Sequence, residues 1–106
     1  MVFQVGDGDG AFRSGTWVDP QGEAHSLGTD EIELAALDYR DIKPGRVPVA
    51  WQLDIPAMGL SLRVSAPPGT YWNDGLYPYW ESPASVSGSV DGSGYMELTG
   101  YGESAE

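Results

Sequence analysis

The sequence predicts an all-β protein whose antiparallel strands follow one another in an up-and-down barrel, closed or partly open. Apolar and polar residues alternate with period two over residues 47–55, which places Trp51 and Leu53 on one buried face of a strand. The chain has 15 Gly and 8 Pro, so turn residues recur at short intervals. About eight strand-like runs result, at the spacing typical of a barrel or sandwich, and strands that are neighbours in sequence usually pair.

The front of the chain contains three short strand-like runs, Val2–Val5, Phe12–Val18 and Ala24–Leu27. Residues 6–10, an alternation of Gly and Asp, separate the first two and predict a loop. Residues 19–22, Asp-Pro-Gln-Gly, predict the turn before the third run.

Residues 31–39 allow two interpretations. The first half of the segment alternates as in a strand, and Leu37 and Tyr39 then take the opposite phase, which indicates a β-bulge. The alternative is a short helix, because Asp30 and Glu33 have the spacing of an N-cap and its capping box. We favour the strand.

A hairpin joins residues 47–55 to residues 60–66, with Pro-Ala-Met-Gly at 56–59 as its turn. Residues 71–79, dense in aromatic residues, Gly, Pro and Asn, are expected to form a loop.

A second hairpin is expected near the end of the chain. Residues 85–90 alternate serine with valine, and Asp91-Gly92 is a turn dipeptide whose glycine tolerates positive φ. Residues 95–101 form the return strand, in which Met96 and Leu98 share one face.

Charge and composition exclude several classes of protein. With 16 acidic and 5 basic residues the net charge is −11, which opposes binding to nucleic acid and to anionic membranes. No apolar run is long enough to span a bilayer. The chain has no cysteine, so hydrophobic packing must hold the fold without disulfides or thiolate metal sites.

The first residues carry no signal peptide, since no charged segment followed by an apolar stretch is present. We therefore expect a soluble, cytoplasmic protein. A strand begins at Val2, which suggests that Met1 opens a shortened chain or the product of a split gene.

Motifs along the chain resemble those of the AttH/carotenoid-hydratase family. The last third contains Tyr79-Trp80-Glu81, Val86-Ser87-Gly88 and Gly94-Tyr95-Met96-Glu97-Leu98-Thr99-Gly100-Tyr101. Upstream stand Ser14-Gly15-Thr16 with Asp19-Pro20-Gln21-Gly22, and Val47-Pro48-Val49-Ala50-Trp51 with Ile55-Pro56. The closing motif is fairly specific, and the others are weak alone. Ser82 departs from the usual Gly and Val47 from the usual Tyr, which relaxes a close backbone approach at Ser82.

The resemblance implies two lipocalin-like barrels side by side, in a family of carotenoid hydratases and, more distantly, polyene cyclases. Residues 1–106 would form one lipocalin-like barrel, the C-terminal half of that architecture, without the first barrel and its own opening strands. The expected function is to bind an apolar small molecule, with hydratase or cyclase chemistry if it is catalytic. The alternative is a non-catalytic assembly half that pairs with another barrel or copy, for example as a homodimer, through an exposed sheet edge.

Aromatic residues are the candidate ligand-binding groups. Trp51, Trp80, Tyr79 and Tyr95 could stack on a flat or polyene ligand, although for Trp51 and Trp80 we favour the alternative that they fill the core of a small barrel. Trp17 and Trp72 are further candidates for the pocket.

Acidic residues are the candidate catalytic groups. Glu81, beside a large aromatic, is the candidate proton donor, because an indole neighbour can raise a carboxyl pKa. A carboxylate bonded to loop backbone is the simpler alternative. Glu97 faces the same choice, and His25, the only histidine, lacks a catalytic partner by spacing.

No cofactor or metal site is expected. Asp7-Gly8-Asp9-Gly10 begins like a calcium loop, but Ala11 and Val18 stand where that loop needs an oxygen ligand and a glutamate.

Overall fold

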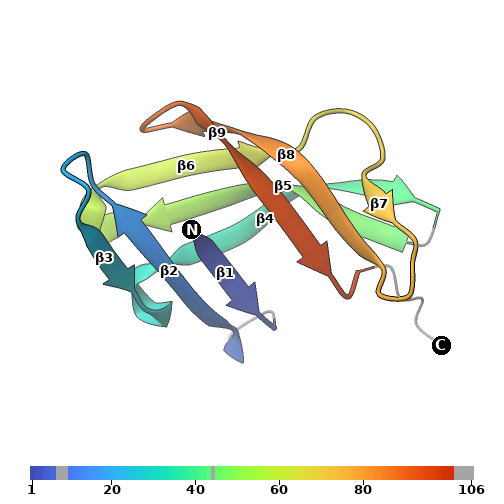
Figure 1. The fold of residues 1–106 in the computed structure, drawn as a ribbon, viewed down its shortest axis with the longest axis horizontal. Coiled ribbons are helices and arrows are strands. Elements are labelled where there is room, and N and C mark those ends of the chain that lie inside the picture. Colours follow the sequence, from blue (N-terminus) through green and yellow to red (C-terminus); the bar gives the residue numbers. More distant parts are fainter. Residues whose placement is uncertain (7–9, 44, 102–106) are drawn as a thin grey trace.

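The computed structural model describes residues 1–6, 10–43 and 45–101, and these form antiparallel strands joined by loops and short 3-10 turns (Figure 1). The strands are β1 Val2–Val5, β2 Phe12–Val18, β3 Ala24–Leu27, β4 Glu33–Ile42, β5 Gly45–Ile55, β6 Leu60–Ser65, β7 Trp72–Asn73, β8 Tyr79–Gly88 and β9 Gly92–Thr99. The 3-10 turns are Thr29–Glu31 and Pro56–Met58. The expected all-β, antiparallel class is confirmed.

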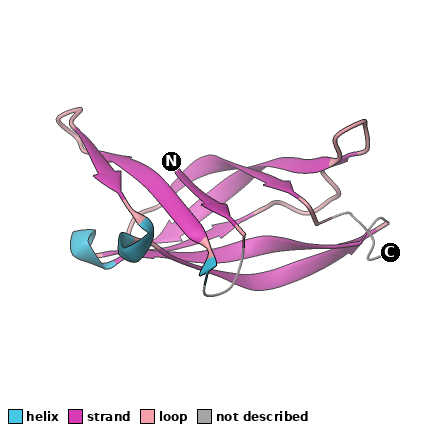
Figure 2. Cartoon of the chain, turned by 90° about the horizontal axis from the view of Figure 1, so that it is seen from below, coloured by secondary structure: helices cyan, strands magenta, loops and turns pink. Residues whose placement is uncertain are grey.

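The strands form two sheets that do not join into a closed barrel. The smaller sheet has the order β1-β2-β3. In the larger sheet, β4, β5, β6 and β8 follow in order. Strand β7 pairs with the beginning of β8, beyond the part of β8 that pairs with β6, and β9 pairs with the opposite edge of β8. Figure 2 shows the two sheets as facing layers, linked at the end that carries the 3-10 turns. The arrangement is an open lipocalin-like barrel.

The predicted hairpin between β5 and β6 is confirmed, and it forms the floor of the fold. Trp51 pairs with Val64 and Leu53 with Leu62, so the period-two pattern places all four side chains on the inner face. Gly59 ends the connecting 3-10 turn with a φ of 65°, a left-handed conformation that favours glycine.

Strand β4 contains the predicted bulge. Ala36 pairs with Trp51 and Asp38 with Ala50, so Leu37 is left without an opposite residue and is exposed. Of the alternative helix only one 3-10 turn forms, before β4, where Glu31 accepts a hydrogen bond from the backbone N–H of Gly28 at 2.8 Å.

The last hairpin differs from its prediction at both ends. Strand β8 begins at Tyr79, and β7 lies in the segment expected to be a loop. Residues 89–91 connect β8 to β9, so Asp91 ends the turn and Gly92, which pairs with Val86, is already in β9. The glycine with positive φ in this hairpin is Gly88, at 120°, and a Cβ there would also collide with the backbone of Ser61. Packing against β6 therefore fixes the turn.

Two hydrophobic cores lie at opposite ends of the molecule. Leu27, Ile32, Ile55 and Leu60 form the core at the end that carries the 3-10 turns. Val47, Val49, Trp80, Ala84 and Met96 form the core at the other end. The middle of the molecule, between the two cores, is left incompletely filled.

None of the helical segments among the described residues is long and apolar enough to cross a membrane. The acidic, glycine-rich motif considered as a calcium loop includes residues 7–9 and lies outside the described residues.

Candidate functional site

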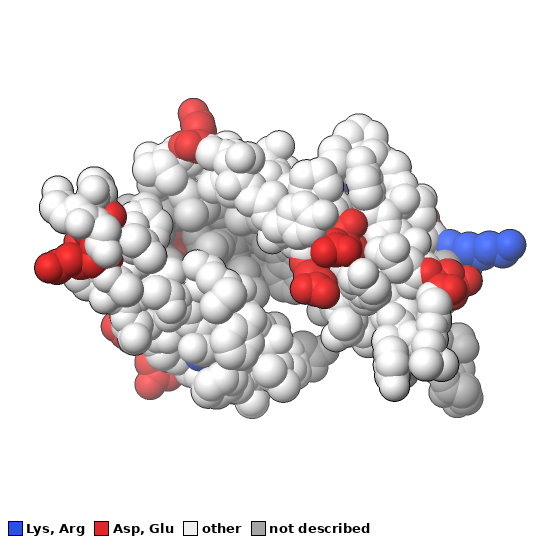
Figure 3. All heavy atoms as spheres, in the orientation of Figure 1, with Lys and Arg blue, Asp and Glu red and all other residues white. Residues whose placement is uncertain are grey.

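A cavity of about 920 Å³ lies between the two sheets and opens to solvent. Its lining includes Val2, Trp17 and Leu53, which pack against one core, and Trp51, Val64 and Leu98, which pack against the other. Figure 3 shows the hollow near the centre of one face of the molecule. The volume is in the range of small-molecule sites.

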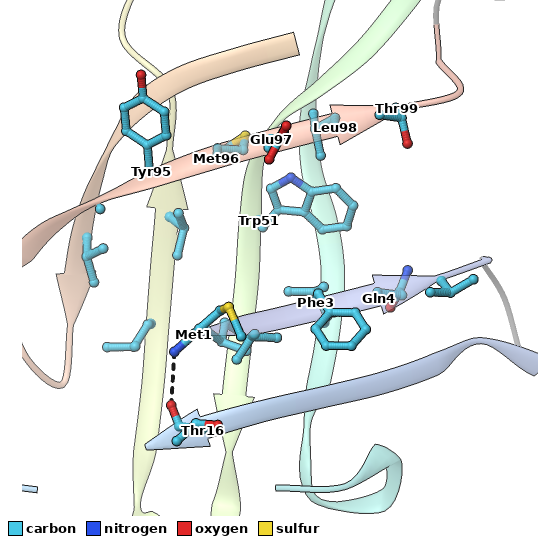
Figure 4. Close-up of a pocket in the computed structure, with 18 of the residues that line it drawn as sticks. Met1, Phe3, Gln4, Thr16, Trp51, Tyr95, Met96, Glu97, Leu98 and Thr99 are labelled. Atoms are coloured by element: carbon cyan, nitrogen blue, oxygen red, sulfur yellow. Dashed lines mark hydrogen bonds between the residues drawn. The ribbon is translucent and has the colours of Figure 1, made fainter. Parts of the chain in front are cut away.

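The floor of the cavity is apolar. It consists of inner-face side chains from the larger sheet: Leu34, Trp51, Leu53, Leu62, Val64 and Val86. Trp51 is only half-buried, because no side chain from the smaller sheet covers it fully. Figure 4 shows its indole between β9 and β1, at the centre of the opening. A flat apolar ligand could cover this ring.

Strands β1 and β9 form the two lips of the opening. Figures 1 and 4 show them facing each other across it and running in the same direction. Among the described strands, β1 pairs only with β2, and β9 only with β8. Both strands therefore have one free edge, and the opening is the seam along which the barrel fails to close.

Strand β1 is held close to β2 at Gly15. A Cβ on Gly15 would lie 2.7 Å from the carbonyl oxygen of Met1, so only glycine allows this approach. The amino group of Met1 donates to the carbonyl of Thr16 at 2.9 Å, and the Thr16 N–H donates back to the Met1 carbonyl at 2.8 Å. These contacts fix the position of β1, one of the two lips of the opening.

Polar groups gather on the β9 lip. Among the described residues that line the cavity, Glu97 carries the only charged side chain. Tyr95, two residues earlier in the strand, is 70% exposed, and Figure 4 shows its ring pointing away from Trp51. Met96 and Leu98 alternate with them and point inward, as the period-two pattern predicted.

Glu81 and Tyr79 lie outside the cavity lining. They share the outer face of β8, opposite Glu97 and Thr99 of β9. The Tyr79 hydroxyl donates to a Glu81 carboxylate oxygen at 3.1 Å, and this hydrogen bond, with the negative charges of Glu81 and Glu97, raises the pKa of Tyr79. The residue expected as a proton donor is thus engaged with a phenol on the outer face.

Trp80 lies in a core and also outside the cavity lining. It is fully buried, with the edge of Tyr71 against its ring at 5.7 Å between centroids and the guanidinium of Arg40 at 5.8 Å. Its indole N–H donates to the hydroxyl of Ser82 at 2.9 Å. Ser82 stands where the family usually has glycine, and its hydroxyl supplies the acceptor that the buried indole N–H needs.

Of the two other tryptophans, Trp17 lines the cavity and Trp72 does not. Sequence reasoning missed the contribution of Leu34 and of β1, because no local pattern shows which face of an edge strand borders a cavity. The alternation within each strand could have suggested the inward side chains, but not the separation of the sheets.

The described residues contain one group that could hold a metal ion. Ligand atoms of Asp19, Glu23 and His25 lie within 4.8 Å of one another at the β2–β3 turn. Asp19 already accepts backbone N–H groups of Gln21 and Glu23 and contacts the His25 ring at 3.0 Å. The hydrogen bond to His25 is the main cause of the lowered pKa of Asp19. We assign this group to the stability of the turn.

Comparison with protein families matches residues 1–101 to the family described as AttH-like. The chain belongs to the AttH-like family. The resemblance of its motifs to that family is thereby confirmed. Comparison with curated proteins and with solved structures gave no match.

The structure explains two motif positions of this AttH-like chain. Gly15 allows the close contact between β1 and β2, and Gly88 allows the contact between β8 and β6. Both contacts hold elements that border the cavity. These two motif glycines therefore belong to the framework of the site.

Proposed function

We propose that this AttH-like chain binds an apolar small molecule in the cavity between its two sheets. The observation that supports the proposal most directly is the composition of the lining. Charged residues make up 20% of the chain, yet Glu97 is the only charged side chain among the described lining residues. An apolar floor with a few polar groups at the rim is the usual composition of a small-molecule site.

Within this proposal, Trp51 is the main contact for the ligand, and the Tyr95 ring, which points away from Trp51, takes no part in the contact. Trp51 is central in the opening and half-exposed, so a ligand would bury aromatic surface that is now in contact with water. Of the residues expected to bind, Trp80 and Tyr79 have no place in this binding mode, because neither lines the cavity.

Diphenylhexatriene, a flat uncharged polyene that fluoresces in apolar surroundings, tests the proposal. We expect saturable binding, and we expect Trp51→Ala to weaken it about tenfold or more, which corresponds to ~1.4 kcal/mol or more. The readout is the fluorescence of the probe, so removal of a tryptophan does not disturb it.

Trp72→Phe is the matched control. Trp72 is also half-buried but does not line the cavity, and its indole N–H has no hydrogen-bond partner among the described residues, so phenylalanine loses no such bond. The control variant should bind like the parent chain. An equal loss of affinity in both variants, or the absence of saturable binding by the parent chain, would rule out the proposed site.

Binding, rather than a hydratase or cyclase reaction, is the function that the geometry favours. A reaction of either kind would need a proton donor against the bound hydrocarbon. Glu81, the expected donor, lies outside the cavity lining and accepts the hydrogen bond of Tyr79. A catalytic role for Glu81 would require a substrate on the outer face of β8.

A second candidate function is assembly with another chain, such as a second copy. The free edges of β1 and β9 support it, because unpaired backbone groups at a sheet edge are ready to pair. Phe3 and Val5 of β1 are exposed large apolar residues. Since β1 and β9 run in the same direction, a single strand antiparallel to both could close the seam.

A further inference from the structure

We propose that the seam between β1 and β9 receives an extended segment of another protein, in which apolar residues alternate with lysine or arginine, as an added strand paired to both lips. The inference rests on the assembly function proposed above, and it names the partner that the seam fits. The apolar side chains of this segment face the floor of the cavity, and its cationic side chains face solvent beside β9.

The free edge of β1 offers the backbone groups of Val2 and Gln4. Met1 and Thr16 exchange two backbone hydrogen bonds, at 2.9 and 2.8 Å, so they form a hydrogen-bonded pair of the β1–β2 ladder. Hydrogen-bonded and non-hydrogen-bonded pairs alternate along an antiparallel ladder. Val2 and Gln4, at the alternate positions, therefore direct their N–H and C=O groups away from β2 and into the seam.

The free edge of β9 offers the same groups of Tyr95, Glu97 and Thr99. On β8, the N–H of Glu81 donates to the carbonyl of Tyr71 at 3.1 Å, and it therefore points away from β9. Glu81 and Glu97 are consequently a non-hydrogen-bonded pair, so the backbone groups of Glu97 point to the free edge. The residues two positions before and after Glu97 do the same. Both lips thus present regularly spaced donors and acceptors to the seam.

The direction of the two lips selects an isolated segment rather than a strand of a folded sheet. Strands β1 and β9 run the same way on either side of the opening, so one strand antiparallel to both would pair with each lip (Figures 1 and 4). Such a strand needs both of its own edges free. Strand β1 or β9 of a second copy has only one free edge, so it can pair with one lip but not with both. An extended segment outside any sheet meets the requirement.

The side chains around the seam define the chemistry of the segment. On its inner face the segment would cover Trp51 and the apolar floor, which calls for apolar residues. On its outer face it would lie beside Glu97, whose opposite residue Glu81 is also acidic. None of the 5 lysines and arginines of the chain lies in β1, β8 or β9. Because opposite charges on neighbouring strands stabilise a sheet, lysine or arginine is the complementary choice.

A peptide of 8 residues, the length of β9, in which lysine and valine alternate, tests the inference. Fluorescence anisotropy of the labelled peptide at low ionic strength measures its binding. We expect saturable binding, and we expect a peptide with glutamate in place of lysine to bind about tenfold more weakly or worse. A peptide with the same composition but all its lysines before all its valines should also bind more weakly, because it cannot place one kind of side chain on each face.

Two N-methylated peptides test the pairing with each lip. One carries methyl groups on the backbone nitrogens of the valines, and the other on those of the lysines. Successive N–H groups of a strand point to opposite edges, so each peptide loses its donors toward one lip while its side chains stay the same. Both should bind about tenfold more weakly or worse, because several hydrogen bonds are lost.

Tyr95→Pro is the matching change in the protein. Proline removes the N–H that Tyr95 directs into the seam, and it spares the hydrogen bonds to β8. Peptide binding should weaken about threefold or more. Tyr95→Ala is the control, because it removes the same side chain and keeps the N–H, and it should bind the peptide like the parent chain.

The outcomes separate this inference from the functions proposed above. If only one N-methylated peptide binds weakly, the segment pairs with one lip, which overturns insertion between the two. If neither does, charge and apolar contact alone hold the peptide, and the inference also fails. If the peptide does not bind but the chain associates with itself, the inference fails while the assembly function stands. If neither the peptide nor a second copy binds, the assembly function fails, and the binding of diphenylhexatriene still tests the cavity by itself.

Discussion

At the scale of single residues, the same residue type has different roles according to the face of the strand on which it lies. Trp51 and Trp80 both belong to aromatic-rich family motifs, but Trp51 faces the cavity and Trp80 is fully buried in a core. Sequence reasoning left both roles open for each tryptophan. It could not decide between them, because the decision depends on the distance between sheets that are remote in sequence.

Ser82 is the residue at which departure from the family pattern has a clear physical reason. Its hydroxyl is fully buried and accepts the indole N–H of Trp80. We predict that Ser82→Ala lowers the free energy of unfolding by about 1–3 kcal/mol, because it leaves a buried donor without an acceptor. Urea denaturation, followed by tryptophan fluorescence, measures the change.

The control for this prediction is Ser85→Ala on the same strand. Ser85 is exposed, so removing its hydroxyl should change the free energy of unfolding by less than about 0.5 kcal/mol. Equal effects of the two substitutions would contradict the role assigned to the Ser82 hydroxyl.

At the scale of elements, alternation and turn residues predicted most strands to within a few residues. The bounds of β1, β2 and β3 and the bulge in β4 agree with the sequence analysis. The turn of the last hairpin was predicted at the wrong residues. Asp91-Gly92 has the local chemistry of a turn, but the residue that must be glycine is Gly88, because it lies against the backbone of Ser61 in β6. Local propensity was overridden there by the contact between β8 and β6.

That contact gives a prediction for the hairpin. Gly88 has a φ of 120°, and an added Cβ would collide with the Ser61 backbone, so Gly88→Ala should lower the free energy of unfolding by about 1–3 kcal/mol. At Gly92, where φ is not positive and an added Cβ meets nothing within 4 Å, alanine should be nearly neutral. Thermal unfolding of both variants by circular dichroism makes the comparison. A greater loss of stability in Gly92→Ala than in Gly88→Ala would instead support Asp91-Gly92 as the turn, as the sequence suggested.

At the scale of the whole molecule, the open seam determines both proposed functions. The seam exposes the apolar floor to a ligand, and it leaves two strand edges able to pair with another chain. The partly open barrel was expected from the sequence, but the location of the opening between β1 and β9 was not. Strand pairing depends on backbone hydrogen bonds that no residue pattern specifies at an edge.

The assembly candidate leads to a prediction about oligomeric state. If the free edge of β1 is an interface, the parent chain should form dimers or larger species at high concentration, as measured by size-exclusion chromatography with light scattering. Val5→Lys places a charge beside this edge, where Val5 is 61% exposed, and should shift the chain to the monomer. The fold should tolerate the substitution, because the side chain is already in contact with solvent.

Val18→Lys is the comparison that separates an edge effect from a general gain in solubility. Val18 is similarly exposed, at 58%, but it lies on β2, where it pairs with Ala24 of β3 and is not part of β1. This variant should associate like the parent chain, since the substitution lies on another strand than the free edge of β1. A parent chain that stays monomeric at every concentration would exclude self-association through β1. If both lysine variants dissociate equally, the contact depends on apolar surface rather than on the strand edge, and the open seam then serves the ligand alone.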